Sequence, residues 1–293
     1  MRAALEADRA LSGRDDAMLA TAVNEAFPRL RARLREQHDD ARAQIERDFP
    51  WALSALDWDA DLLGGLGKER SEVSHTRFLA YLLDSRASHG LGIRPLRELF
   101  RLLARLIPGD HTFARLSGDA DDAAERLRRV RVIAEHAVEA PAASGAGVEE
   151  RRCDIWLELV EEGHALVVVI ENKVDAGEHD EQLASYEQAV WKWAKDHRRN
   201  SFEQRLVFLT PEGRMPDGGD DHAAWLPISY TELAAALAHA ARDAAEPGRT
   251  LVLLYVSTVA KWILEIPAQL DEVNFARRLA WMHEVIEQGA HRE

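Results

Sequence analysis

Residues 153–173 read CDIWLELVEEGHALVVVIENK and determine the architecture of the chain. Residues 153–160 alternate apolar and polar side chains, as a β-strand with one buried face does. Residues 161–164 contain a glycine and form a turn, and residues 165–174 are almost continuously apolar. A strand that is apolar on both faces is typical of the centre of a sheet covered by helices on both sides. The sequence therefore predicts a β-hairpin whose second strand lies in the middle of a sheet.

The polar residues at the open end of this hairpin are an aspartate, a glutamate and a lysine. A turn of two or of four residues places Asp154 directly across from Glu171, where the Cβ atoms lie about 5 Å apart. Lys173 is two residues beyond Glu171 and shares its face. Two carboxylates held this close repel each other unless one is protonated or a cation lies between them. A register slip of one residue would separate them.

These three side chains suit metal-dependent hydrolysis. Two carboxylates and a backbone carbonyl provide the hard oxygen ligands that Mg²⁺ and Mn²⁺ prefer. Such an ion stabilises charge on a phosphoryl oxygen and lowers the pKa of the attacking water, and a neighbouring lysine orients that water or neutralises the transition state. The competing interpretation is a strand end at which the glutamate and the lysine form a surface ion pair. The facing aspartate and the apolar strand behind it favour a functional site.

The rest of the chain alternates between helical and strand patterns. Amphipathic spacing predicts helices over residues 14–48, 72–83, 93–106, 178–196, 232–241, 250–264 and 272–287. Further strands are expected over residues 131–138, 205–210 and 226–229, and Thr231 is expected to cap the helix that follows the last of them. From residue 131 the order is β-β-β-α-β, which predicts a mixed α/β layer structure.

Composition limits the class of protein. The 293 residues are 46% hydrophobic and carry a formal net charge of −14, and this acidity speaks against a general nucleic-acid binder. Twelve arginines and no lysine lie between Arg70 and Arg131, and solvated helix faces are favoured over a phosphate-binding surface as their explanation. The single cysteine, Cys153, excludes an internal disulfide and a cysteine-rich zinc site. There is no apolar run of membrane-spanning length and no signal-peptide pattern, so a cytoplasmic protein is expected.

Three sequence blocks carry a resemblance to a known family. Asp154, followed after sixteen residues by Glu171-Asn172-Lys173, resembles the motif of the PD-(D/E)XK nuclease superfamily. The segment Gln182-Leu183-Ala184-Ser185-Tyr186 is similar to the Gln-x-x-x-Tyr element of several of its branches. Upstream, residues 72–84 with Ser88-His89-Gly90 are similar to the N-terminal block of a branch of mostly uncharacterised bacterial proteins. The position before the aspartate is Cys153 and not proline, a departure that removes no ligand.

The resemblance implies an α/β fold of the restriction-endonuclease type. Its core has the order α-β-β-β-α-β, with a mixed central sheet flanked by helices and with helical additions at both ends. The expected organisation is a helical N-terminal extension over residues 1–68, a nuclease-like domain over residues 69–264 and a C-terminal helix within residues 265–293.

The resemblance also implies a role for each matching residue. Asp154 and Glu171 would be metal ligands together with the backbone carbonyl of Asn172, and Lys173 would be the catalytic lysine. Glu72 would be the acidic residue of the first core helix that completes the metal site in many members. Gln182 and Tyr186 lie four residues apart on one helical face and would contact the site or a substrate phosphate. For Tyr186, the apolar stripe of its helix equally fits a core tyrosine.

The expected function is that of a nuclease dependent on Mg²⁺ or Mn²⁺, with DNA favoured over RNA as the substrate. Cleavage of two strands often needs two active sites, which favours a homodimer. Two alternatives remain open: a noncatalytic nucleic-acid-binding or assembly module on the same fold, and a metal-dependent phosphodiesterase of small nucleotides. The intact carboxylate–lysine set disfavours the first, and the acidity of the chain favours it.

Overall fold

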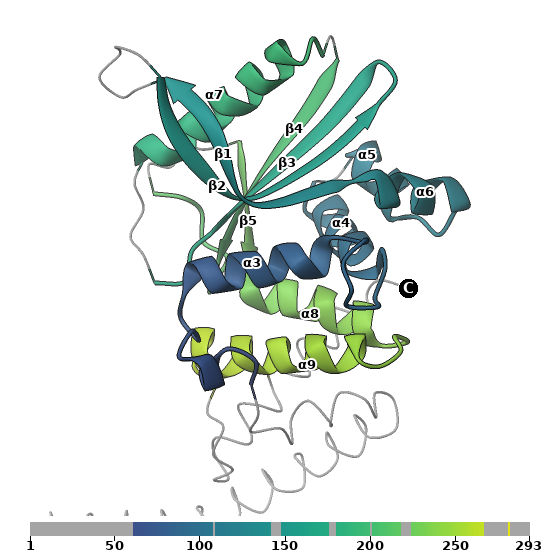
Figure 1. The fold of residues 1–293 in the computed structure, drawn as a ribbon, viewed down its shortest axis with the longest axis vertical. Helices are drawn as coiled ribbons and strands as arrows, with labels where there is room; N and C mark the ends of the chain where they lie inside the picture. The colour runs from purple at the N-terminus through teal and green to yellow at the C-terminus, as the bar shows by residue number, and fades with distance from the viewer. Residues whose placement is uncertain are drawn as a thin grey trace, which may run out of the picture. The chain divides into compact units, whose positions relative to one another are not determined.

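The computed structural model describes most of the chain from residue 61 to residue 266 (Figure 1). The described ranges are 61–107, 109–141, 148–175, 180–199, 201–217 and 224–266, together with Trp281. The predicted helix over 14–48 lies outside these residues, as does all of the predicted helix over 272–287 except Trp281, together with nearly all of the expected extension 1–68 and of the segment 265–293.

Seven α-helices lie within the described residues: α3 (Glu72–Leu83), α4 (Arg94–Leu106), α5 (His111–Ser117), α6 (Asp121–Arg129), α7 (Asp180–Asp196), α8 (Tyr230–Ala241) and α9 (Gly248–Thr258). A short 3₁₀ helix precedes them at Gly64–Leu66, and a π-helical turn, Val259–Ile263, continues α9. The predicted ranges of α3 and α4 agree with the structure to within one residue. None of the described helices combines the length and the hydropathy that crossing a membrane requires.

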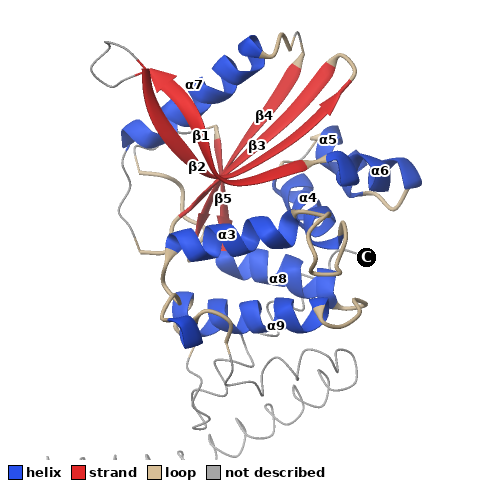
Figure 2. Cartoon of the chain, viewed as in Figure 1, coloured by secondary structure: helices blue, strands red, loops and turns tan. Residues whose placement is uncertain are grey.

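A five-stranded mixed sheet forms the centre of the fold (Figure 2). Its strands are β1 (Arg131–Pro141), β2 (Val148–Glu161), β3 (His164–Asn172), β4 (Phe202–Thr210) and β5 (Trp225–Ser229). They lie in the order β1-β2-β3-β4-β5, with the first three antiparallel and the last three parallel. The elements α3-β1-β2-β3-α7-β4 therefore have the predicted α-β-β-β-α-β order, and the predicted α/β class is confirmed.

Strand β3 is the central strand, as its apolar sequence predicts. All its residues after His164 are buried. Val167 and Val169 pack in one hydrophobic cluster with Tyr186 of α7, whereas the side chain of Asn172 contacts Thr76 of α3. Because side chains alternate across a strand, α7 and α3 cover opposite faces of the sheet (Figure 1).

The β2–β3 hairpin has a two-residue turn, Glu162-Gly163, with Glu161 paired to His164. Gly163 has a φ of +76°, a conformation that glycine adopts without steric cost. This turn gives the register predicted from the sequence, and the ladder follows it as far as the pair Ile155 and Ile170.

The β1–β2 ribbon changes its alternation beside the end of that ladder. Ile133 and Val138 of β1 pack with the same hydrophobic cluster as Tyr186, although they are five residues apart. Cys153 and Trp156 of β2 do so too, although they are three residues apart. Regular strands would put such residues on opposite faces. The change occurs around Glu135, whose φ of +51° lies in the left-handed region.

The cap of α8 differs from the prediction. Thr231 was expected at the N-cap, but the helix begins at Tyr230, and its N-cap is Ser229, two residues earlier than predicted. The Ser229 hydroxyl accepts the N–H of Glu232 at 3.1 Å, and the Glu232 carboxylate accepts the N–H of Ser229 at 2.8 Å. This reciprocal capping box satisfies two donors at once, which a threonine two residues later cannot do.

Candidate active site

The candidate site lies where β3 ends, beside the first turn of α3. The ladder between β2 and β3 stops at Ile155 and Ile170, one residue before the predicted pair of Asp154 and Glu171. Beyond it, Oδ2 of Asp154 accepts the backbone N–H of Asn172 at 2.8 Å. The aspartate therefore meets the peptide that directly follows Glu171, and the register brings the two acidic residues together as predicted.

The pKa of Asp154 is raised toward neutral pH. Burial raises the pKa of its carboxyl group to about 6, against the hydrogen bond from Asn172 and the charge of Lys173, which lower it. The negative charges of Glu72 and Glu135 raise this pKa further. A carboxylate in this range loses its proton readily when a cation approaches.

Glu171 is the most deeply buried acidic group of the site. It is 1% exposed, and its Oε1 lies 2.9 Å from Nζ of Lys173. Its Oε2 is buried without a hydrogen-bond partner among the described residues. Burial, followed by the charge of Asp154, raises the pKa of Glu171 to about 8 even though Lys173 opposes the shift. An acid placed in this way is destabilised whenever it is ionised without a further cation.

Lys173 keeps its proton in spite of its burial. Its backbone N–H donates to the carbonyl of Leu209 on β4 at 2.9 Å, which fixes the chain just after β3. Burial lowers the pKa of its ammonium group, but the carboxylates of Glu171, Glu72 and Asp154 outweigh this, so the pKa lies above its usual value. The lysine is thus a charged donor at the site.

Glu72 reaches the site from the first turn of α3. Ser71 caps that helix by accepting the N–H of Ser74, which sets the direction of the turn. Oε1 of Glu72 accepts the N–H of Val174 at 2.9 Å, directly after Lys173. The acidic residue predicted on the first core helix therefore lies beside the predicted lysine.

The two residues predicted on α7 are placed differently. Tyr186 is fully buried, and its hydroxyl donates to the carbonyl of Arg152 at 2.6 Å. Its ring lies in the cluster that contains Trp225, which fits the alternative of a core tyrosine, and a contact to substrate stays a prediction. Gln182 lies in the first turn of α7, and its side chain is outside the described part.

Sequence reasoning missed a fourth acidic residue, Glu135. The pairs Ala134–Ile155 and His136–Cys153 place it beside Asp154 on the neighbouring strand. Its Oε2 accepts from Nε and Nη2 of Arg77 on α3 at 2.7 and 2.5 Å. The strand over residues 131–138 was predicted from its alternation, but the sequence between the first two strands indicates no turn length from which to derive the register.

The donor set was compared with the needs of a metal ion. The described part contains no group of three or more His, Cys, Asp or Glu side chains arranged to hold one. Mg²⁺, however, is usually bound through one or two carboxylates, with waters and substrate phosphates as its other ligands. Asp154 and Glu171 meet that lower requirement, and Oε2 of Glu171 is a buried acceptor without a hydrogen-bond partner among the residues that the structure describes. The residues present therefore fit a hard divalent cation.

Comparison with known proteins identifies a family for this chain. A family model described as PD-(D/E)XK nuclease superfamily matches residues 61–257, which contain all the residues discussed above. No curated protein and no solved structure matches the chain significantly. The match covers more than half of the chain and all five strands of the sheet. The chain therefore belongs to the PD-(D/E)XK nuclease superfamily.

Proposed function

We propose that this protein is a metal-dependent nuclease that hydrolyses phosphodiester bonds of DNA, in preference to RNA. The observation that carries the proposal is Glu171: a carboxylate that is 1% exposed, lies next to a second buried carboxylate and has an oxygen without a hydrogen-bond partner among the described residues. A strand end without chemistry gains nothing from this arrangement, because each uncompensated buried charge costs stability.

Asp154, Glu171 and the backbone carbonyl of Asn172 would hold Mg²⁺ or Mn²⁺, with Glu72 beside them. When bound, the ion would supply charge stabilisation at a phosphoryl oxygen and lower the pKa of water near it. The raised pKa values of Asp154 and Glu171 mean that cation binding and proton release are linked at neutral pH.

Lys173 would act directly on the reaction. Its ammonium group can donate a hydrogen bond to the attacking water and so hold the oxygen lone pair toward phosphorus. It also supplies positive charge to the phosphate as charge develops in the transition state. The water oxygen forms the new bond to phosphorus and gives up a proton to solvent, while the bond to the leaving oxygen breaks and the leaving oxygen takes up a proton from solvent. The bond between the Lys173 N–H and Leu209 keeps the lysine at a fixed place during this exchange.

Nucleic acid is the substrate class that membership of a nuclease superfamily favours. The proposal also includes a preference for DNA and a homodimer, in which each of two active sites cleaves one strand. Light scattering of the purified chain, alone and with duplex DNA, measures the oligomeric state, and a monomer in both samples would refute the homodimer.

A cleavage assay tests the proposed activity. The full chain is incubated with plasmid, linear duplex, single-stranded DNA and RNA in the presence of Mg²⁺, Mn²⁺ or a chelator. We expect cleavage of DNA with either ion and none with the chelator. Lys173→Ala is expected to abolish it, and Lys192→Ala is the matched control, because Lys192 pairs with Asp196 at 2.7 Å on the exposed side of α7.

Three outcomes would contradict the proposal. Metal-independent binding of nucleic acid without any cleavage would indicate a noncatalytic module on the same fold. Turnover of short nucleotides without cleavage of plasmid would indicate a small-nucleotide phosphodiesterase. Cleavage by Lys173→Ala at the wild-type rate would show that the activity comes from another site or from a contaminant.

A further inference from the structure

The middle residue of the Glu171-Asn172-Lys173 triplet is held by its side chain at three points. Asn172 is fully buried. Its Oδ1 accepts the hydroxyl of Tyr230 at 2.5 Å, and its Nδ2 donates to Oγ1 of Thr76 at 3.2 Å and to the carbonyl of Glu72 at 3.3 Å. These partners come from α8 and α3, so two helices fix the orientation of one amide group.

The same residue is fixed through its backbone, because its N–H donates to Oδ2 of Asp154. Its two peptide units connect Glu171, a proposed ligand, to Lys173. A rotation of Asn172 would therefore move its carbonyl relative to Asp154 and would move the flanking side chains of Glu171 and Lys173. The side-chain contacts on α3 and α8 oppose that rotation.

Tyr230 is itself fixed in place. It is the first residue of α8 and directly follows the N-cap Ser229, which forms the capping box with Glu232. It is fully buried, and its hydroxyl interacts with that of Tyr255, which is also fully buried. Tyr255 lies 3.0 Å from Nδ1 of His75, the next member of this polar cluster.

His75 joins the cluster to the segment before α3. Its Nε2 lies 2.8 Å from the carbonyl of Glu69, which can only accept, so Nε2 carries the proton and Nδ1 accepts from Tyr255. Burial lowers the pKa of His75, which keeps the ring neutral. A network in which the buried polar groups are paired holds one geometry, since breaking any bond leaves an unpaired group.

We propose that Tyr230 and Thr76 are positioning residues that orient Asn172, and thereby set the affinity of the site for a divalent cation. The inference rests on the proposed function, because it assumes that the carbonyl of Asn172 is a ligand. Hydrogen-bonding partners behind a ligand commonly change metal affinity by about 10- to 100-fold when they are removed.

The test is calorimetric titration of Mn²⁺ into the folded full-length protein at one pH, without nucleic acid. Tyr230→Phe removes only the hydroxyl that binds Asn172, and we expect its Mn²⁺ affinity to fall by about tenfold or more. Thr76→Val removes a different bond to the same amide and is expected to act in the same direction. It also keeps the inference open to test should Tyr230→Phe fail to fold.

Tyr255→Phe is the matched control, since it deletes an equally buried hydroxyl that does not contact Asn172. We expect it to lower thermal stability as Tyr230→Phe does, but to change Mn²⁺ affinity by less than about twofold. A loss of affinity that follows thermal stability across the three variants would overturn the inference, as would wild-type affinity in both Tyr230→Phe and Thr76→Val. Absence of Mn²⁺ uptake by the wild type would instead overturn the proposed function itself.

Discussion

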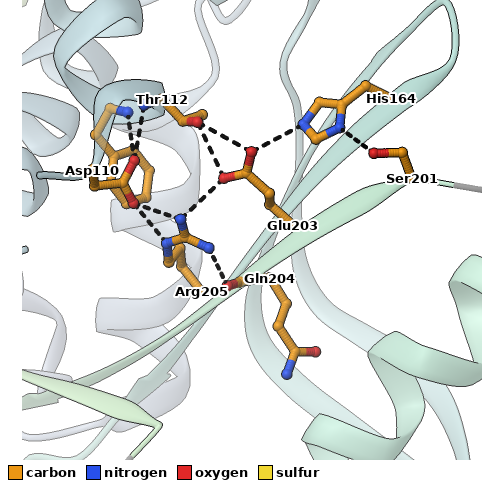
Figure 3. Close-up of polar contacts among 8 residues, drawn as sticks. Asp110, Thr112, His164, Ser201, Glu203, Gln204 and Arg205 are labelled. Atoms are coloured by element: carbon orange, nitrogen blue, oxygen red, sulfur yellow. Dashed lines mark hydrogen bonds and ion pairs between the residues drawn. The ribbon is translucent and has the colours of Figure 1, made fainter.

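The two ends of strand β3 carry charged clusters that differ in how their charges are matched. The end at His164 lies in a cluster that connects the start of β4 to α5 (Figure 3). Glu203 accepts from the Thr112 hydroxyl at 3.1 Å and from Arg205 at 3.0 Å, and His164 lies 3.4 Å from it. Arg205 also pairs with Asp110, which caps α5.

At the other end, acidic groups exceed their positive partners. Asp154, Glu171 and Glu72 surround the single ammonium of Lys173, and burial raises the pKa of both Asp154 and Glu171. The first cluster pairs its carboxylates with donors of the same chain and so fastens α5 to the sheet. In the second, buried Glu171 and Asp154 both interact with Lys173, and a proton or a further cation would stabilise this arrangement of carboxylates.

The largest expected difference between the two ends is in catalysis. Asp154→Asn keeps the size of the side chain and removes the negative charge, and we expect DNA cleavage to fall by at least about 100-fold. Arg205→Ala at the far end is expected to leave the rate per folded molecule unchanged. Cleavage rates normalised to the folded fraction from circular dichroism provide the comparison. Equal losses of cleavage rate in both variants would show that the charge of Asp154 has no role in catalysis beyond that of a charge at the other end of β3.

The next difference is in stability and runs the other way. Arg205→Ala leaves Asp110, whose side chain is 2% exposed, without its ion pair. We expect the free energy of unfolding to fall by about 1–3 kcal/mol, because a buried carboxylate loses its compensating charge. Asp154→Asn is expected to leave the unfolding free energy of the metal-free protein at or above that of the wild type. Urea denaturation at pH 7.5 measures both, and a larger loss in Asp154→Asn would reverse the comparison.

The pH dependence of stability sharpens the comparison further. The pKa of Glu171 is about 8 in the folded protein and lower when unfolded, so the folded state keeps a proton that the unfolded state releases. The stability from this group is complete below the unfolded pKa and is lost as the pH rises toward 8. Glu171→Gln removes the titration. We expect the wild type to lose about 4 kcal/mol relative to this variant between pH 5 and pH 8.5 without metal.

The relative change with pH is the quantity to measure, since Glu171→Gln also removes the partner of Lys173 at every pH. Thermal denaturation in a chelating buffer at several pH values gives it. Parallel pH curves for the wild type and the variant would mean that Glu171 is not held in its protonated form.

The smallest expected effect concerns Glu135. Its negative charge raises the pKa of Asp154, and Arg77 offsets part of that charge. Glu135→Gln is expected to lower the pKa of Asp154 while changing the unfolding free energy little, because the ion pair with Arg77 is largely exposed. Carboxyl-carbon NMR titration of the metal-free protein detects the shift. An unchanged pKa of Asp154 would place Glu135 outside the electrostatics of the site.

Local sequence patterns were sufficient for the part of the site that lies on one hairpin. The turn at Glu162-Gly163 fixes the register, and the register brings Asp154 to the peptide after Glu171. The apolar run before Glu171 correctly predicted a central strand. Glu72 was assigned only through the resemblance to a family, since a glutamate in the first turn of a helix has a sufficient local explanation in the helix dipole.

The rest depends on contacts between residues far apart in the sequence. Tyr230 reaches Asn172 across 58 positions, and Thr76 reaches it across 96. Contacts over such sequence separations leave no periodic pattern of apolar and polar residues from which they could be predicted. Tyr186 fitted a substrate contact and a core position equally well; in the structure its hydroxyl donates to the carbonyl of Arg152, which fits the core position and leaves the substrate contact a prediction.

Titration of Mn²⁺ into the metal-free wild type and into Asp154→Ala tests the central claim most directly, because it measures whether the site end of β3 takes up a cation. Saturable binding by the wild type that is lost in the variant, with both proteins folded, is the predicted result. Absence of binding by the wild type, or equal binding by the variant, would contradict the account.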